Sequence, residues 1–323
     1  WDGVESVWPV HGNVLVTPGG NGAGPTVWAV AGRSSFLSGG IHVCRLKLAT
    51  GKLISETVMD TRGTRPGGNG DEKAAGGGIS QSCLPDVLSC DGKNVFMRHV
   101  RFDMAAKRQV ERRADPGVPH IFCSVGFVDD TWWSRCYWVY GTKAPLEHGL
   151  SGWPREAWRC PFGRILALDG KTVYGFGRDD IGGGYSGGHA GFARKGKRAP
   201  EYRLFAAPAA SVPVPKNGRK HKDTRENVLW KPAWARSVPL LARAMVLGRD
   251  RIVIAGPPEG DVKNLADALA GKQGGRLLAA SRADGKTQGE LKLDSAPVFD
   301  GMCAAGGRLY VSCVDGRVRC YGE

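Results

Sequence analysis

The sequence lacks any run of about 18 apolar residues, the length that a membrane-spanning helix requires. It also has little that favours helices, because it contains 48 glycines and 19 prolines, and glycine costs about 1 kcal/mol in a helix interior. So much glycine and proline beside an ordinary apolar content of 41% indicates many short strands joined by tight turns. We therefore expect an all-β protein without a membrane span.

Signatures of several enzyme classes are missing as well. The sequence contains no H-E-x-x-H zinc motif, and none of its seven histidines has another at i, i+4. The glycine-rich stretch 18–25 lacks the Lys-Ser/Thr of a phosphate-binding loop. We therefore assign no catalytic residue and favour a binding module over an enzyme.

A short turn-strand unit recurs along the chain. In each copy a glycine-containing turn, often Asp-Gly, precedes an alternating apolar run, which is a strong hairpin signal. The clearest copies are 91–98, 169–178, 248–256, 306–313 and 315–322. In a second element, a strand ends in Ala-Thr-Gly-Lys or Ala-Asp-Gly-Lys and another strand returns, as at 41–58 and 275–293.

This spacing predicts about six units of roughly 50 residues with three or four antiparallel strands each, which is the period of β-propeller blades. We expect residues 1–323 to form one all-β propeller domain, or the C-terminal portion of one. Loop insertions are expected near 60–78, 179–228 and 257–274. Helix is expected for fewer than about 10% of the residues.

Longer stretches resemble a known family. They run from near the first residue to the last, at 7–16, 29–43, 84–98, 126–141, 163–178, 238–259 and 297–322. They resemble the C-terminal part of bacterial quinoprotein-like (PQQ-like) β-propeller repeat proteins. The repeats of that family are related to those of quinoprotein alcohol dehydrogenases and of an outer-membrane assembly lipoprotein. The family usually carries further repeats ahead of the first match, and this chain begins at Trp1, so we expect a partial or processed product.

The resemblance implies a periplasmic or extracellular protein of the cell envelope that acts as a binding or scaffold module for a protein or glycan. Quinone-dependent dehydrogenases typically hold two adjacent cysteines against the cofactor, and this sequence has no Cys-Cys pair. We therefore expect no cofactor. The alternative is a quinone- or metal-dependent oxidoreductase or a glycan-active enzyme, with PQQ or Ca²⁺ in the propeller channel.

Two groups of residues are candidate ligand sites. Acidic residues lie beside indoles and a cation in one stretch, a combination that suits a sugar, a peptide or Ca²⁺, although a turn and packing between blades explain it too. These residues are Asp129, Asp130, Trp132, Trp133 and Arg135. A second candidate, for an anion, comprises Arg33, Ser34 and Ser35. Ordinary turn chemistry explains the second group equally well.

Nine cysteines, an odd number without a C-x-x-C pair, favour an oxidising compartment. A two-residue turn at Asp129-Asp130 would set Cys123 opposite Cys136 on paired strands, and we predict that disulfide. A turn at Asp315-Gly316 would make Cys313 and Cys320 diagonal neighbours on one face, so a second disulfide is possible there. Strand geometry argues against the pairs Cys83–Cys90 and Cys303–Cys313.

The formal net charge of +14 suggests polyanion partners. Basic residues concentrate at 194–198 and 216–225, where solvated loops are the simpler interpretation because no aromatic residues are interleaved. The last strand, 317–322, would leave an open sheet edge. We therefore expect a segment near Trp1, or another chain, to complete the last sheet.

Overall fold

The fold is given by a computed structural model. It describes residues 6–10, 14–19, 24–33, 35, 39–60, 88–97, 100–109, 118–123, 138–141, 161–178, 202–209, 231–259, 267–268 and 270–322. These residues form 22 strands and helix only at 267–268. None of them belongs to a helix long and apolar enough to cross a membrane. The all-β prediction is confirmed for this part of the chain.

The chain divides into two compact units, Trp1–Val128 with Val139–Ala157 and Asp129–Trp138 with Trp158–Glu323. That the whole chain forms a single domain stays a prediction. In the first unit, one antiparallel sheet has the order β1-β2-β3-β4, with strands Leu15–Thr17, Thr26–Ala31, Ile41–Lys47 and Leu53–Met59. The next has the order β5-β6-β7-β8, with strands Leu88–Cys90, Asn94–Met97, Val100–Asp103 and Arg108–Gln109.

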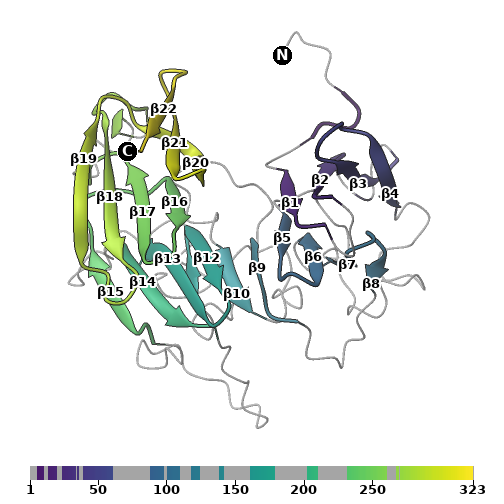
Figure 1. Ribbon diagram of the computed structural model, residues 1–323, viewed down its shortest axis with the longest axis horizontal. Coiled ribbons are helices and arrows are strands. Elements are labelled where there is room, and N and C mark those ends of the chain that lie inside the picture. The colour runs from purple at the N-terminus through teal and green to yellow at the C-terminus, as the bar shows by residue number, and fades with distance from the viewer. Residues whose placement is uncertain are drawn as a thin grey trace, which may run out of the picture. The chain divides into compact units, whose positions relative to one another are not determined.

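The second unit contains three further sheets, whose strands run from teal to yellow in Figure 1. The first holds β12 to β15: Ile165–Asp169, Thr172–Arg178, Tyr202–Pro208 and Trp234–Ser237. The second holds β16 to β19: Ala244–Leu247, Arg251–Gly256, Gly275–Ser281 and Thr287–Leu293. The third holds β20 to β22: Pro297–Ala305, Arg308–Cys313 and Val318–Tyr321. Every sheet follows the order of its strands along the chain.

The number of blades differs from the expectation. A sixth sheet of order β11-β10-β9 uses the short segments His120–Cys123, Trp138–Gly141 and Phe162–Gly163, which are separated by residues outside the described part. We do not count it as a blade. The described part of the chain therefore contains five blades, and the expectation of about six units was too high.

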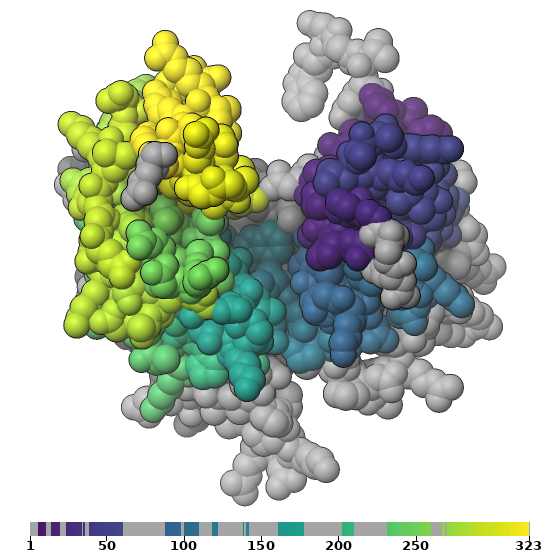
Figure 2. Space-filling view, in the orientation of Figure 1, coloured from purple at the N-terminus to yellow at the C-terminus, as the bar shows by residue number. Residues whose placement is uncertain are grey.

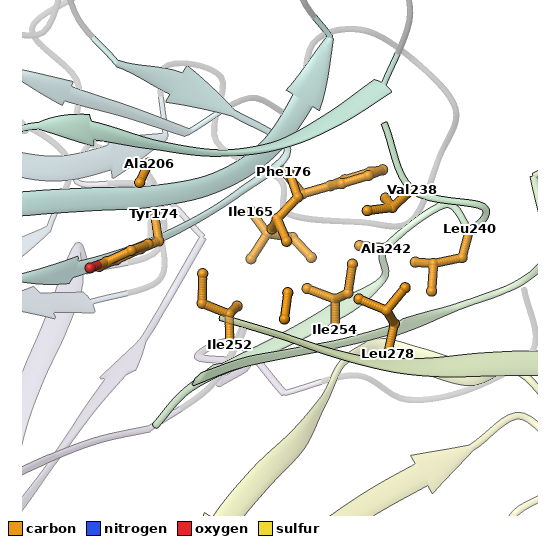
Figure 3. Packing of buried hydrophobic residues seen from close by; sticks show 12 residues of the cluster. Ile165, Tyr174, Phe176, Ala206, Val238, Leu240, Ala242, Ile252, Ile254 and Leu278 are labelled. Atoms are coloured by element: carbon orange, nitrogen blue, oxygen red, sulfur yellow. The ribbon is translucent and has the colours of Figure 1, made fainter. Parts of the chain in front are cut away.

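Neighbouring sheets pack face to face within each unit. In the first unit, Trp28, Ile41 and Val43 contact Val95 and Phe102 of the following sheet. In the second unit, Phe176 and Leu204 of one sheet share a buried cluster with Ile252, Ile254 and Leu278 of the next. Figure 3 shows Phe176 facing Ile254 and Leu278. Since alternate residues of a strand face opposite sides, each sheet has one face for the sheet before it and one for the sheet after it. This is the packing of propeller blades.

Glycine-containing turns join the first two strands of several blades, as the sequence predicts. The Asp91 carboxylate accepts hydrogen bonds from the backbone N–H groups of Lys93 and Asn94 at 2.8 and 2.6 Å. Burial alone would raise the pKa of Asp91, but the hydrogen bonds from Asn94 and Lys93 outweigh it and hold the pKa below its usual value. Gly92 takes a φ of 88°, which favours glycine over other residues.

The strand register at the C-terminus corrects the prediction for Cys313 and Cys320. The Cys313 N–H donates to Arg317 O at 2.9 Å, so three residues rather than two form the turn. Cys320 therefore lies opposite Tyr310, on the face that Cys313 does not share, because a shift of one residue reverses the faces of a strand. Both cysteines are free, and so are Cys44, Cys90 and Cys303. The Cys313–Cys320 disulfide, which the sequence left possible, is therefore not formed, and the register behind it was wrong.

The other cysteine predictions have separate outcomes. Cys303 lies opposite Tyr310 and is exposed, whereas Cys313 is buried, so these two face opposite sides as expected. Cys83 and Cys136 lie outside the described residues, and the Cys123–Cys136 disulfide stays a prediction. Most of the expected insertions, and the basic runs at 194–198 and 216–225, also lie outside them.

Candidate functional site

Most residues of the predicted ligand sites lie outside the described part of the chain. This holds for Asp129, Asp130, Trp132, Trp133, Arg135 and Ser34. Arg33 is exposed, whereas Ser35 is fully buried. A ligand at either site, including PQQ or Ca²⁺, stays a prediction. Among the residues that are described, no three His, Cys, Asp or Glu side chains come together as metal ligands.

A different site emerges from a turn that recurs between the third and fourth strands of the blades. In the turn Ser281–Lys286, the Ser281 N–H donates to Lys286 O at 2.8 Å and the Gly285 N–H donates to Ser281 O at 2.9 Å. We call this element a docking turn, because it contacts the outer strand β15 of the preceding sheet. The Trp234 Nε1–H donates to Arg282 O at 3.0 Å, and the Arg236 Nε–H donates to Asp284 O at 3.1 Å.

Gly285 marks the closest approach between this turn and β15. Its φ is 71°, and a Cβ added there would lie 2.5 Å from two carbons of the Trp234 ring. Glycine is therefore required twice, once for the left-handed backbone and once because the indole occupies the space of a side chain. The turn and the indole fit each other without room for a methyl group.

Arg282 fixes the docked turn to the preceding sheet. Its guanidinium donates to Gly248 O and Arg249 O at 2.9 and 2.8 Å, and also to the carboxylate of Asp169. It lies 4.9 Å from the centre of the Tyr174 ring and donates to the Tyr174 hydroxyl at 3.3 Å. The Tyr174 hydroxyl and then Asp169 raise the pKa of Arg282. The side chain thus bridges two blades through charged and aromatic contacts.

The first unit contains a second docked copy, which is shorter. In the turn Asp103–Lys107, the Asp103 N–H donates to Lys107 O at 3.0 Å. Ala106 has a φ of 65° and is fully buried. The hydroxyl of Thr57, on β4 of the preceding sheet, donates to Ala106 O at 2.7 Å. A donor on the outer strand of one sheet therefore holds the turn of the next sheet in both units.

A third copy of the turn, Lys47–Lys52, has no such partner among the described residues. Its hydrogen bonds match those of the docked copy: the Lys47 N–H donates to Lys52 O at 2.9 Å, and the Gly51 N–H donates to Lys47 O at 2.8 Å. Gly51 has a φ of 66°, and no described atom lies within 4 Å of a Cβ placed there. Leu48, at the position of Arg282, is 49% exposed. The turn is therefore formed, and no described strand of another sheet docks on it.

The sheet that carries this turn also has a face against which no other described sheet of the first unit packs. We call it the backward face: it is the side of the β1–β4 sheet that points away from the β5–β8 sheet. Strand register and the turns align its residues Val27, Ala29, Cys44 and Leu46 with Ile252, Ile254, Leu278 and Ala280 of the β16–β19 sheet. The four residues of the β16–β19 sheet are at most 1% exposed. The four residues of the backward face are only partly buried.

The segments that lead into these two blades also differ in burial. Pro9 O accepts a hydrogen bond from the Gly32 N–H at 3.0 Å, and in the β16–β19 blade Pro239 O accepts one from the Glu259 N–H at 3.1 Å. The second contact lies two residues further along its sheet, because Val10 pairs with Ala31 whereas Leu240 pairs with Pro258. The next residue is Val10 in the first blade, which is 60% exposed, and Leu240 in the other, which is fully buried. An apolar residue therefore follows the proline in both segments, exposed in the first blade and buried in the other.

One side-chain contact occurs at equivalent positions in the two blades. His42 Nδ1 lies 2.6 Å from Glu56 Oε1, and Arg276 Nη1 donates to Glu290 Oε1 at 2.9 Å at the equivalent positions. Trp8 packs on His42 with ring centroids 5.0 Å apart. Beside them, burial and then the charge of Glu56 raise the pKa of the Cys44 thiol. Cys44 is thus held in its protonated form, which suits packing better than nucleophilic catalysis.

The sequence predicts the turns of this site but not which of them docks on a neighbouring sheet. The two Ala-x-Gly-Lys elements predict the turns at Gly51 and Gly285, and both turns form. That one turn is docked and the other is not depends on tertiary contacts, which no local pattern records.

Comparison with known proteins adds similarities of fold alone. No protein-family model and no curated protein sequence matches the chain. It is similar to the crystal structure of the tricorn protease, with 14% identity, a TM-score of 0.42, and coverage of 95% of this chain and 29% of that one. It is also similar to BamB from Moraxella catarrhalis, with 11% identity, a TM-score of 0.36, and coverage of 92% of this chain and 67% of that one. Its similarity to dihydro-heme d1 dehydrogenase NirN in complex with DHE has 12% identity, a TM-score of 0.42, and coverage of 97% of this chain and 54% of that one.

The chain thus spans less than a third of the tricorn protease chain and about half of the NirN chain. At this level of similarity, the class of the protein follows from its own sheets. Successive antiparallel meanders that pack face to face and dock through a repeated turn define a protein of the β-propeller class.

Proposed function

We propose that this chain is a non-enzymatic binding and scaffold module of the quinoprotein-like propeller class, located in the periplasm or outside the cell. We further propose that it binds a partner protein through the backward face and the turn Lys47–Lys52. The observation that carries this proposal is the open space at Gly51, where the equivalent Gly285 contacts an indole.

The chemistry of the surface favours a protein partner over a glycan. The backward face offers aliphatic side chains and a turn whose carbonyl oxygens accept hydrogen bonds in the docked copies. A blade with an apolar face and a side-chain donor on its outer strand fits both features. Sugar sites rely instead on exposed aromatic rings beside acids, which in this chain occur at Asp129–Arg135. The envelope location and the family rest on the sequence resemblance.

A matched pair of substitutions tests the proposal. Gly51→Asn keeps the left-handed turn, because asparagine tolerates a positive φ, but it places a side chain where a docked strand would lie. Gly306→Asn is the control, because Gly306 has a φ of 57° in a hairpin turn and no described atom within 4 Å of its Cβ position.

The immobilised chain and both variants are exposed to an envelope extract from the source organism. We expect a protein that the unaltered chain and Gly306→Asn retain and that Gly51→Asn retains at least about tenfold less. If the three forms retain the same proteins in equal amounts, the backward face is not the binding surface.

A further inference from the structure

The last blade offers a second interaction surface, which is independent of the backward face. In the four-stranded blades, the third strand pairs with a fourth on its outer edge, as β3 does with β4, β7 with β8, β14 with β15 and β18 with β19. β22 occupies the third position of its blade, but no strand in the described part of the chain pairs with its outer edge. Figure 2 shows this blade in yellow at the surface of its unit.

The backbone groups on this edge follow from the hydrogen bonds of the hairpin. The Cys313 N–H bonds to Arg317 O, and the register pairs Val311 with Arg319. Because hydrogen-bonded and non-hydrogen-bonded pairs alternate in an antiparallel ladder, the N–H and C=O groups of Arg319 point towards β21. Those of Val318 and Cys320 point away from it. They form a short row of donors and acceptors on the open edge.

The hairpin holds this edge in a fixed geometry. Asp315 accepts two hydrogen bonds from the Arg319 guanidinium, at 3.1 and 2.7 Å, and a third from the Arg317 N–H at 3.2 Å. Gly316 has a φ of 77°, which completes the turn. An edge that is already extended loses little conformational freedom when another strand joins it.

The side chains around the edge indicate the kind of strand that fits. Val318 is 66% exposed, which is the largest exposure among the large apolar residues of the described part of the chain. Arg308 and Arg317 are exposed on the same hairpin, and the chain has a net charge of +14. Val318 is adjacent to the cationic Arg317, and this pair favours a β-branched or aliphatic residue next to an acid in the added strand.

We propose that β22 is a strand-addition site for an extended, acidic segment of a partner protein, which pairs antiparallel with β22. The fourth strands of the other blades are antiparallel and span two to seven residues. The bound segment has a comparable length. It draws affinity from backbone hydrogen bonds and specificity from alternate side chains.

The probe is a fluorescein-labelled peptide with the β19 sequence TQGELKL in which glutamate replaces the lysine, tested on the full chain by fluorescence anisotropy. A counterpart that keeps the lysine of β19 and carries lysine in place of its glutamate, TQGKLKL, tests the charge. We expect saturable binding of the acidic peptide, several-fold weaker binding of the basic one, and loss of affinity as salt rises. Equal or tighter binding of the basic peptide overturns the acidic specificity, and no binding at about 1 mM peptide overturns the site.

Two substitutions at one residue locate the binding. Val318→Pro removes an outward N–H and leaves the bonds to β21 intact, since proline is tolerated on an edge strand whose N–H faces solvent. Val318→Thr keeps the N–H. We expect Val318→Pro to weaken binding at least about tenfold and Val318→Thr to change it less than about threefold. Unchanged binding by Val318→Pro, with circular dichroism confirming the fold, would place the peptide elsewhere. Neither variant touches Gly51, so this test and that of the proposed function can fail separately.

Discussion

The pair Gly285 and Gly51 provides a quantitative test of what a docked turn contributes. Both residues have a left-handed φ, 71° and 66°, in turns with the same backbone hydrogen bonds. They differ in their surroundings: a Cβ at Gly285 would lie 2.5 Å from the Trp234 ring, whereas a Cβ at Gly51 would meet no described atom within 4 Å. The change to alanine therefore adds the same backbone strain at both sites and a steric clash at only one.

The two contributions have separate magnitudes. An L-residue in the left-handed region costs about 1–2 kcal/mol, and this term is shared by both variants. Forcing an extra methyl group into a packed contact costs about 1–3 kcal/mol. A shift of Trp234 to relieve the clash would also weaken its 3.0 Å hydrogen bond to Arg282 O, a further loss of about 1 kcal/mol. We expect Gly285→Ala to lower the free energy of unfolding by about 2–4 kcal/mol more than Gly51→Ala does.

Urea denaturation followed by tryptophan fluorescence measures this difference, with the free energy taken from the transition of the second unit for Gly285→Ala and of the first for Gly51→Ala. Gly170→Ala provides a control, because Gly170 has a φ of 52° and no described atom within 4 Å of its Cβ position. If Gly285→Ala and Gly51→Ala destabilise equally, the indole does not hold the turn and the docking account fails.

Three further outcomes follow from the same contacts. Arg282→Lys cannot reach Gly248 O, Arg249 O and Asp169 together, and we expect urea denaturation to show a loss of about 1–3 kcal/mol; an unchanged midpoint would mean that the bridge contributes nothing. Trp234→Phe removes the donor to Arg282 O and should lower stability by about 1–2 kcal/mol in the same assay, a smaller loss than for Trp234→Ala. The Arg319 hydrogen bond lowers the pKa of Asp315 to about 2. The stability from that ion pair is therefore full above about pH 4 and disappears as the pH falls through 2. Over that window an Asp315→Asn variant should show a shallower pH dependence of its unfolding midpoint, and identical profiles would refute the assignment.

Local sequence signals predicted local structure well. Asp-Gly at 91–92 and 169–170 and Gly-Gly at 306–307 lie in the turns between the first two strands of their blades. These signals work because a positive φ and an Asp that accepts nearby backbone N–H groups are properties of a few adjacent residues. The recurrence of such turns was enough to predict an all-β fold built from blades.

The failure at Cys313 and Cys320 has an equally local cause. The sequence Val-Asp-Gly-Arg fits a two-residue turn and also a three-residue turn with glycine in the left-handed position. The structure adopts the second, with Gly316 N–H bonded to Cys313 O at 3.0 Å. One added residue moved every side chain of β22 to the opposite face, so a disulfide that depended on the register was predicted wrongly.

The docking site could not be predicted, because its evidence lies in contacts between distant residues. Gly51 and Gly285 look alike in sequence, and only the position of Trp234, 51 residues before Gly285, separates them. The sequence did place aliphatic residues at Val27, Ala29 and Leu46. Their partial exposure depends on which sheets are present to cover them.

The most direct test of the central claim is to add a blade ahead of the β1–β4 sheet. In an extended chain, a second copy of residues 158–237, which contains β12 to β15, directly precedes Trp8. Trp8 then follows the copy of β15, as Val238 follows β15 in the original chain. The rate at which a maleimide modifies Cys44 on the backward face is then measured, with exposed Cys303 as the internal control. Our account predicts that the added blade slows the modification of Cys44 at least about tenfold, leaves Cys303 unchanged, and loses this effect when Gly51→Asn is introduced. An unchanged rate at Cys44 in the extended chain would contradict the claim that the backward face is a docking surface for a blade.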